Sequence, residues 1–157
     1  MQTSPVSEEP SRYIPAKPKM DVYEAGRIFR TCAYCRVSTD HEEQAYSLEL
    51  QKEHWAKVVK EHKNWSLLHV FADEGITATS TKHRVQFNQM IEDCLNDKYD
   101  LIVTKSVSRF ARNVVDGIEI ARKLKNHNPP VGIFFEADGI FTLVEDSEIR
   151  LSIMFSF

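Results

Sequence analysis

The stretch FRTCAYCRVSTD, residues 29–40, determines how the rest of this chain is interpreted. Residues 29–37 contain no Gly or Pro and predict a β-strand. Because side chains on a strand alternate between its two faces, we expect Tyr34, Arg36 and Ser38 on one face, with Ser38 at the carboxyl end. A guanidinium two residues from a hydroxyl suits a phosphate ester, since Arg offers two parallel hydrogen bonds to phosphate oxygens and stays charged. The alternative is that Ser38 only caps or bends the chain while Arg36 pairs with a surface carboxylate.

The same stretch contains a C-x-x-C pair, Cys32 and Cys35, which could indicate a redox centre or half of a zinc site. Residues three apart on a strand point to opposite faces, so these thiols cannot share a metal or form a disulfide without a turn. A structural zinc site would need a second pair of ligands, and Cys94 has no Cys or suitably spaced His beside it in the sequence. We therefore expect Cys32 and Cys35 to act as small hydrophobic residues.

Beyond this strand, the chain alternates strand-like and helix-like segments. The predicted strands are 29–37, 65–73, 99–105 and 131–137. The predicted helices are 47–63, 85–95, one that starts near Ser108 and one that starts at Asp146 or Ser147. The alternation predicts an α/β fold with a mostly parallel central sheet and helices on both faces. Ligands of such sheets bind at the carboxyl ends of the strands, where Ser38 is expected.

Two of the helices are predicted in more detail. Ser47 is a candidate N-cap for helix 47–63, and the residues expected on its buried side are Leu48, Trp55 and Val59. The helix that starts near Ser108 has apolar residues at helical spacing, namely Phe110, Val114, Ile118 and Ala121. Between the second strand and the helix at 85–95, residues 73–84 predict a long polar loop.

Composition and charge limit the class of protein. The 157 residues suffice for one domain with a core, and 42% hydrophobic with 27% charged residues disfavours both a membrane protein and a disordered chain. No apolar run approaches the ~18 residues of a membrane span. The formal net charge of −3 gives no global basic bias, so DNA binding would need a local basic cluster. Three cysteines without a dense framework favour a reducing compartment such as the cytoplasm.

Residues 105–125, KSVSRFARNVVDGIEIARKLK, contain such a cluster, with six basic residues against two acidic ones. Arg109 and Arg112 are predicted in the first turn of the helix, where cations oppose the helix dipole at a cost of roughly 0.3–1 kcal/mol each. A phosphate bound at that helix end would reverse the sign of this effect, although a solvated helix face also explains the charges. Arg84, at the end of the polar loop, is a further candidate for binding phosphate.

Six sequence elements occur in the order and at spacings compatible with one known family. They are Y-x-R-V-S-T (Tyr34 to Thr39), S-L-E-L-Q (Ser47 to Gln51), D-E-G-I (Asp73 to Ile76), Arg84, Y-D-L-I-V (Tyr99 to Val103) and S-R-F-A-R-N (Ser108 to Asn113). Over roughly residues 29–157 the chain resembles the catalytic domain of the serine recombinases, the resolvase/invertase family. The S-R-F-x-R-N form and the closing E-D-S-E-I-R-L-S-I-M are more similar to the large serine recombinases, the integrases and transposases of mobile elements.

The resemblance implies a site-specific DNA recombinase and a set of site residues. Ser38 would attack a DNA phosphodiester to give a 5′-phosphoserine linkage and a free 3′-hydroxyl, followed by strand exchange and religation. The arginines that match the family's active site are Arg36, Arg84, Arg109 and Arg112. The supporting positions are Tyr34, Gln51, Asp73, Asp100 and Ser108. The residues expected to bind DNA phosphates are Lys105, Arg109, Arg112 and Asn113. Asp100 matches an active-site carboxylate, Asp73 matches a position that shapes the loop, and Ser108 stands where small resolvases carry Asp.

The expected chemistry requires no cofactor. Four arginines can align and neutralise a phosphodiester, and no carboxylates or histidines cluster with metal-ligand spacing, so no metal is expected. A protein ester preserves the bond energy, so resealing needs no ATP, and the chain has no P-loop motif. The proton of Ser38 would be accepted by Asp100, or neighbouring arginines would lower the pKa of the serine. The alternative functions are a hydrolytic serine phosphoesterase or nuclease and a non-catalytic dimerisation module of the same fold.

Three segments are expected along the chain. Residues 1–28 contain four of the six prolines and predict a flexible leader, residues 29–145 the catalytic domain, and residues 146–157 the start of a long C-terminal dimerisation helix. We expect the natural protein to continue into DNA-binding domains; the alternative is an apolar tail that packs on its own sheet. The expected partners are double-stranded DNA and further copies of the chain, as a homodimer that becomes a tetramer. No membrane or small-molecule substrate is expected, and the predicted setting is the cytoplasm of a bacterial or mobile-element host.

Overall fold

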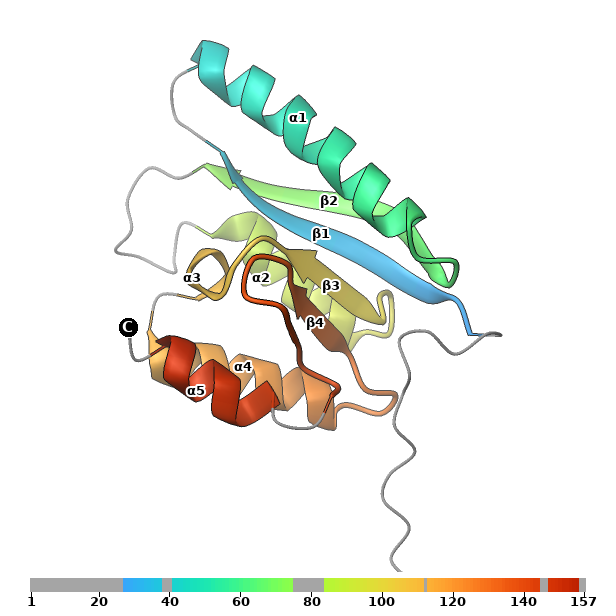
Figure 1. Cartoon of the computed structure of the whole chain (residues 1–157), viewed down its shortest axis with the longest axis vertical. Coiled ribbons are helices and arrows are strands. Elements are labelled where there is room, and N and C mark those ends of the chain that lie inside the picture. The colour runs from blue at the N-terminus through green and yellow to red at the C-terminus, as the bar shows by residue number, and fades with distance from the viewer. Residues whose placement is uncertain (1–26, 38–40, 75–83, 112, 145–146, 156–157) are drawn as a thin grey trace, which may run out of the picture.

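The computed structural model describes residues 27–37, 41–74, 84–111, 113–144 and 147–155. Its centre is a five-stranded sheet in the order β2-β1-β3-β4-β5 (Figure 1). The strands are β1 (Phe29–Val37), β2 (Trp65–Glu74), β3 (Leu101–Thr104), β4 (Gly132–Phe135) and β5 (Ile140–Phe141). Strands β2, β1, β3 and β4 are parallel, and β5 pairs antiparallel with β4. The predicted mostly parallel sheet is confirmed.

Helices pack on both faces of this sheet. Those in the described residues are α1 (His41–Lys60), α2 (Val85–Leu95), α3 (Val107–Phe110), α4 (Val114–Asn126) and α5 (Ser147–Phe155). Figure 1 shows α1 on one face and α2, α4 and α5 on the other. The core is divided in the same way: Trp55 and Val59 of α1 belong to one buried cluster, and Phe87, Leu124 and Leu151 of the other helices belong to the second. The predicted two-sided arrangement is confirmed.

The central strand β1 distributes its side chains between these two clusters by strict alternation. Cys32 and Tyr34 belong to the cluster under α2, α4 and α5, whereas Ala33 and Cys35 belong to the cluster under α1. The two thiols therefore point to opposite faces, as predicted, and all three cysteines are free and buried. Burial and a hydrogen bond with Cys94 raise the pKa of Cys32, and burial raises the pKa of Cys35 to about 11. The thiols therefore stay protonated and contribute apolar packing.

Helix α1 begins six residues earlier than predicted. Its first residue is His41, so Ser47 lies inside the helix, and the prediction that Ser47 is its N-cap is wrong. The segment HEEQAY, residues 41–46, contains strong helix formers and no Gly or Pro, which explains the extension. The hydroxyl of Ser47 instead accepts a hydrogen bond from the Gln51 amide at 3.2 Å. Trp55 and Val59 are buried as predicted, and Leu48 is half-buried.

The single helix predicted from Ser108 is wrong, because the chain forms two helices there. Ala111 and Asn113 have extended backbones, which end α3 and separate it from α4. Ser106 caps α3 by accepting from the Arg109 amide, and Asn113 caps α4 by accepting from the Asp116 amide. Arg109 therefore lies in the last turn of a one-turn helix, and the predicted conflict with a helix dipole does not apply to it.

The turn between β4 and β5 has no counterpart among the predicted elements. The strand predicted at 131–137 ends at Phe135, and the chain reverses so that Phe135 pairs with Ile140. Gly139 has a φ of +60°, a left-handed conformation that glycine adopts without steric cost. Helix α5 then begins at Ser147, as predicted, and the buried Ser147 hydroxyl donates to the Thr142 carbonyl oxygen at 3.0 Å.

Candidate active site

Several of the predicted site residues lie where the parallel strands end, among them Tyr34, Arg36 and Asp73. Arg36 is the penultimate residue of β1 and pairs in register with Asp73 near the end of β2. Tyr34 pairs in register with Thr104, the last residue of β3. Ser38 follows β1 directly in sequence, but Ser38 and Arg112 lie outside the described residues. The carboxyl edge of the sheet thus holds the candidate site.

Asp73 is the buried acceptor around which this edge is organised. One carboxylate oxygen accepts from the Tyr34 hydroxyl at 2.9 Å and from the Phe87 amide at 2.9 Å, and the other accepts from the Gln86 amide at 2.9 Å. The two amides belong to the first turn of α2, so the carboxylate satisfies donors that the helix itself leaves unpaired. Asp73 therefore fixes the start of α2 relative to β1.

Arg84 precedes α2 and has a buried guanidinium, with the residue only 7% exposed. Its Nε donates to the Tyr34 hydroxyl at 3.3 Å, and its Nη2 donates to the carbonyl oxygens of Phe110 and Arg109. The guanidinium carbon lies 3.6 Å from the centre of the Phe87 ring, in cation–π geometry. Arg84 thus connects β1, α2 and α3.

Tyr34 keeps its proton in this network. Burial raises the pKa of Tyr34 to about 12, although the charge of Arg84 acts in the opposite direction. A protonated phenol can donate to Asp73 and accept from Arg84 at once, so the hydroxyl connects the buried cation to the buried carboxylate. The arrangement joins the buried cation and the buried carboxylate in one network beneath the edge.

Arg109 reaches the end of β1 from α3. Its side chain is exposed, and its Nη1 donates to the carbonyl oxygen of Arg36 at 3.3 Å. Gln51 of α1 donates to the same oxygen at 3.2 Å. Two helices on opposite faces therefore hold the peptide carbonyl two residues before Ser38. Arg36 itself is half-buried.

The one-turn helix that carries Arg109 is held by packing rather than by its own hydrogen bonds. Phe110 is fully buried, with edge-on contacts to Phe87 and Phe135 at centroid distances of 5.0 and 5.5 Å. Burial of a Phe side chain stabilises by about 1.5–3 kcal/mol, more than one isolated helical turn can supply. The carboxylate of Asp138, which was not among the predicted site residues, accepts from the Val107 amide at 2.7 Å.

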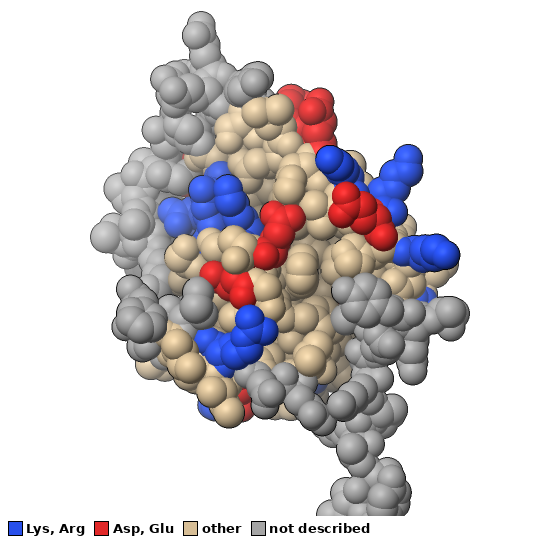
Figure 2. Space-filling model, viewed as in Figure 1, with Lys and Arg blue, Asp and Glu red and all other residues tan. Residues whose placement is uncertain are grey.

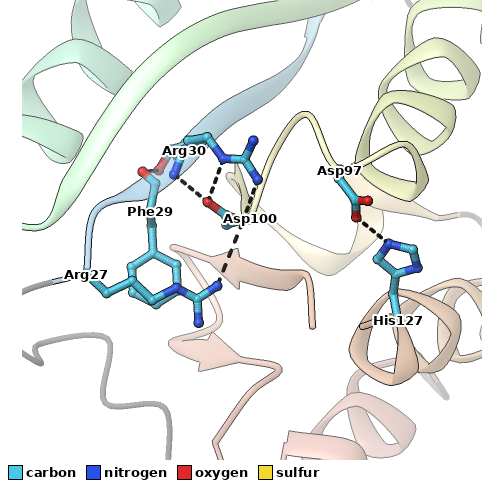
Figure 3. A network of polar contacts seen from close by, with 7 residues as sticks. Arg27, Phe29, Arg30, Asp97, Asp100 and His127 are labelled. Carbon is cyan, nitrogen blue, oxygen red and sulfur yellow. Dashed lines mark hydrogen bonds and ion pairs between the residues drawn. The ribbon is translucent and has the colours of Figure 1, made fainter. Parts of the chain in front are cut away.

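Asp100 does not lie at this edge, which corrects its expected place in the active site. It immediately precedes β3, and its backbone amide bonds Arg30 near the start of β1. Its carboxylate accepts from the Arg30 amide and guanidinium at 3.0 Å and lies 3.8 Å from a nitrogen of Arg27 (Figure 3). Arg30 and Arg36 are six residues apart on one strand, which corresponds to roughly 20 Å. Asp100 thus lies at the opposite edge of the sheet from the end of β1 that Ser38 follows in sequence.

The pKa of Asp100 reflects this structural setting. Burial alone would raise it, but the hydrogen bonds and charge of Arg30, with the charge of Arg27, outweigh burial and lower the pKa. The position of Asp100 could have been inferred from sequence: a residue that precedes a parallel strand lies at the amino edge, whereas Ser38 follows its strand.

The remaining predicted residues lie on the rim of the carboxyl edge. Lys105 follows β3 and is exposed, and Ser108 is exposed with its hydroxyl 3.1 Å from that of Ser106. The Asn113 amide group is engaged with Asp116 as the α4 cap, accepting from its amide and donating to its carboxylate at 2.9 Å. On the face shown in Figure 2, basic and acidic side chains are interspersed, so positive charge is local rather than continuous.

The part of the chain that the structure describes contains neither a cluster of metal ligands nor a membrane-spanning helix. There, no group of three or more His, Cys, Asp or Glu side chains is arranged to hold a metal ion. Within the same residues, no helix has the length and apolar character needed to cross a membrane. The carboxyl edge contains the guanidinium groups of Arg84 and Arg109, which suit an anionic ester.

Comparison with known proteins gives one consistent result. Residues 31–156 match the family model described as the resolvase N-terminal domain. The N-terminal catalytic domain of TP901-1 integrase is similar at 19% identity and a TM-score of 0.63, over 80% of this chain and 90% of that one. A resolvase family site-specific recombinase from Streptococcus pneumoniae is 26% identical, with a TM-score of 0.62 over 80% and 83%. The C-terminal catalytic domain of ISC1926 TnpA, an IS607-like serine recombinase, is 18% identical, with a TM-score of 0.56 over 68% of each chain. No curated protein gave a significant match.

Proposed function

Since the chain belongs to the resolvase family and forms the catalytic domain of a serine recombinase that performs site-specific DNA recombination, we propose that Ser38 is the nucleophile of that reaction. The observation that carries the proposal is the arrangement around the end of β1. The carbonyl of Arg36, two residues before Ser38, accepts hydrogen bonds from Gln51 and Arg109. These hydrogen bonds hold the backbone at the end of β1 from both faces of the sheet, directly before Ser38 in the sequence, and a nucleophile needs such a positioned support.

The reaction proceeds in two balanced transfers. The Ser38 oxygen attacks a DNA phosphorus, the bond to the 3′ oxygen breaks, and the 5′-phosphate becomes esterified to serine while the 3′ oxygen takes up a proton. After strand exchange, a 3′-hydroxyl attacks the phosphoserine, the serine ester breaks and serine regains its proton. Each step replaces one phosphate ester with another, so no ATP is consumed.

The arginines stabilise the charge that develops in both transfers. Arg36, Arg109 and Arg112 contact the phosphate oxygens, and the buried Arg84 supplies positive potential from beneath while it positions α3. The Asp73 carboxylate already accepts three hydrogen bonds, and Asp100 lies at the other edge. Neighbouring guanidinium groups therefore lower the pKa of the Ser38 hydroxyl, so that water or the leaving 3′ oxygen takes its proton.

The DNA contact itself is local and made to phosphates. The residues that would bind the backbone of double-stranded DNA belong to the segment that follows β3 in sequence, namely Lys105, Arg109, Arg112 and Asn113, while the net charge of −3 limits affinity away from this region. Two copies bind one site, and pairs of dimers form a tetramer for strand exchange. A DNA substrate also places the working protein with the DNA, in the cytoplasm of a bacterial host.

The test is covalent trapping on DNA. The probe is an end-labelled duplex made from the DNA that flanks the element carrying the gene, nicked near its centre so that the released strand diffuses away. We expect a denaturant-resistant adduct on the Ser38 hydroxyl, mapped by mass spectrometry and formed equally in EDTA. The Ser38→Ala variant should form no adduct yet retard the same duplex. An adduct on another residue, or unchanged cleavage by Ser38→Ala, contradicts the proposal. Cleavage without resealing on intact duplex would favour a hydrolase.

A further inference from the structure

The one-turn helix α3 is bound by a carboxylate from a distant part of the chain. The Asp138 side chain, in the turn between β4 and β5, accepts a hydrogen bond from the Val107 amide at 2.7 Å. Val107 is the first residue of α3, and Arg109 is two residues further on. With Phe110 fixed in the core at the other end of α3, Asp138 determines the direction in which this single turn points.

Helix α5 holds the turn that carries Asp138. Arg150 donates from Nη1 to the Gly139 carbonyl oxygen at 2.9 Å and from Nη2 to the Asp138 carbonyl oxygen at 3.1 Å. The forked guanidinium thus spans two successive carbonyls, a geometry that Lys cannot reproduce. The Ala137 amide also bonds the Lys105 carbonyl at 2.7 Å, which ties the turn to the segment before α3.

These contacts form one continuous path to the candidate site. It runs from Arg150 through the Asp138 turn to the start of α3, and from α3 through Arg109 to the carbonyl of Arg36. We propose that Asp138 is a positioning residue that sets the orientation of Arg109 toward the scissile phosphate, and that Arg150 holds Asp138 in place. This inference rests on the proposed function, because it assigns Asp138 a part in the reaction only if Arg109 contacts the phosphate.

The role predicts a specific loss for Asp138→Ala. Without the acceptor, the Val107 amide loses its partner and α3 can rotate about Phe110. We expect the rate of adduct formation at saturating DNA to fall about tenfold, the effect of roughly one lost charge-assisted hydrogen bond. Retardation of the duplex should change less than about twofold. Asp138→Asn keeps an oxygen that accepts from Val107, so it should restore most of the rate.

A double-mutant cycle distinguishes positioning from general support. If Asp138 acts through Arg109, then Asp138→Ala should cause little further loss in an Arg109→Ala background. Arg150→Ala should show part of the rate loss of Asp138→Ala. Arg150→Lys should show the same loss as Arg150→Ala. Glu148→Ala is the matched control: it removes an ion pair between α5 and Arg122 of α4 without touching the turn, and should leave the rate unchanged.

The outcomes separate this inference from the proposed function. All rates are measured on full-length protein with the nicked duplex, and folding is checked by thermal unfolding. If the wild type forms its Ser38 adduct and folded Asp138→Ala forms it equally fast, the positioning role is rejected alone. Equal losses in the wild-type and Arg109→Ala backgrounds reject it as well. If Asp138→Ala does not fold, the positioning role is tested by the adduct-formation rates of Arg150→Ala, Arg150→Lys and Asp138→Asn instead. If the wild type forms no adduct at Ser38, the proposed function itself fails.

Discussion

The two edges of the sheet contain the same kinds of residue in opposite electrostatic arrangements. At the amino edge, Arg30 and Arg27 face the carboxylate of Asp100, and His127 faces Asp97 (Figure 3). At the carboxyl edge, the guanidinium hydrogen bonds found among the described residues go to neutral oxygens, from Arg84 to two carbonyls and a phenol and from Arg109 to a carbonyl. A carboxylate cancels a cation, whereas a carbonyl orients it without cancelling its charge.

The difference explains which edge can serve an anionic substrate. Guanidinium groups already paired with carboxylates must lose that partner before they bind phosphate, and the buried Asp100 carboxylate would then lack its cation. Among the described residues, the guanidinium of Arg109 donates to a carbonyl oxygen, so a phosphodiester can gain its attraction without displacing a carboxylate found there. Amino-edge arginines should therefore matter for stability, and carboxyl-edge arginines for the reaction.

The largest expected effect comes from exchanging one arginine at each edge. Arg109→Ala should slow adduct formation by about 10²–10³-fold, the usual cost of removing one charged donor at a developing negative charge, with a small change in unfolding free energy. The matched variant Arg30→Ala should leave the rate within about twofold and reduce the unfolding free energy by about 1 kcal/mol. Single-turnover cleavage and urea unfolding measure the two quantities. Equal rate losses in both variants would remove the distinction between the edges.

The features of the fold and the site that could be predicted from sequence are those that depend on residues close together in the chain. Alternation along residues 29–37 correctly placed Cys32 and Cys35 on opposite faces, because each side chain's direction depends only on its own strand. The bounds of α2 were predicted correctly from its apolar spacing. The carboxyl edge followed from the strand–helix alternation, which fixes the direction of parallel strands.

What was missed depends on contacts between residues far apart in sequence. The apolar residues keep helical spacing on both sides of Ala111 and Asn113, so the spacing could not show that the backbone is extended there. The break between α3 and α4 is fixed by the burial of Phe110 and by the separate N-caps of the two helices, Ser106 and Asn113. The Asp138 contact to Val107 spans 31 residues, and a D-G pair in sequence indicates only a turn. Asp100 was assigned by motif; its place directly before β3 already indicated the amino edge, whereas its partner Arg30 is visible only in the structure.

A smaller effect is expected at the amino-edge carboxylate. Asp100→Asn keeps the shape but removes the charge that Arg30 binds, so it should reduce the unfolding free energy at pH 7 by about 1–2 kcal/mol. The pKa of Asp100 is below its ordinary value of about 3.9, so its ionised form stabilises the fold above that pH. This contribution is lost as the pH falls through the lower pKa of the folded state. The difference between wild type and Asp100→Asn should therefore shrink in urea unfolding at the most acidic pH at which both stay folded. A folded variant that cleaves more than about tenfold slower would return Asp100 to the active site.

The smallest effect is expected at the carboxyl edge for Tyr34, whose neutral hydroxyl lies between Arg84 and Asp73. Tyr34→Phe removes its hydrogen bond to Asp73, but the carboxylate keeps both α2 amides, so the unfolding free energy at pH 7 should fall by only about 1 kcal/mol. The pKa of Tyr34 is raised to about 12 from an ordinary value near 10, chiefly by burial. A raised pKa means that the folded state holds the proton more tightly, so its stabilisation is complete below about pH 10 and is lost as the pH rises toward 12. Wild type should thus lose stability between pH 10 and 12 more steeply than Tyr34→Phe in parallel urea titrations. Identical slopes would mean that burial does not raise the pKa of the Tyr34 hydroxyl.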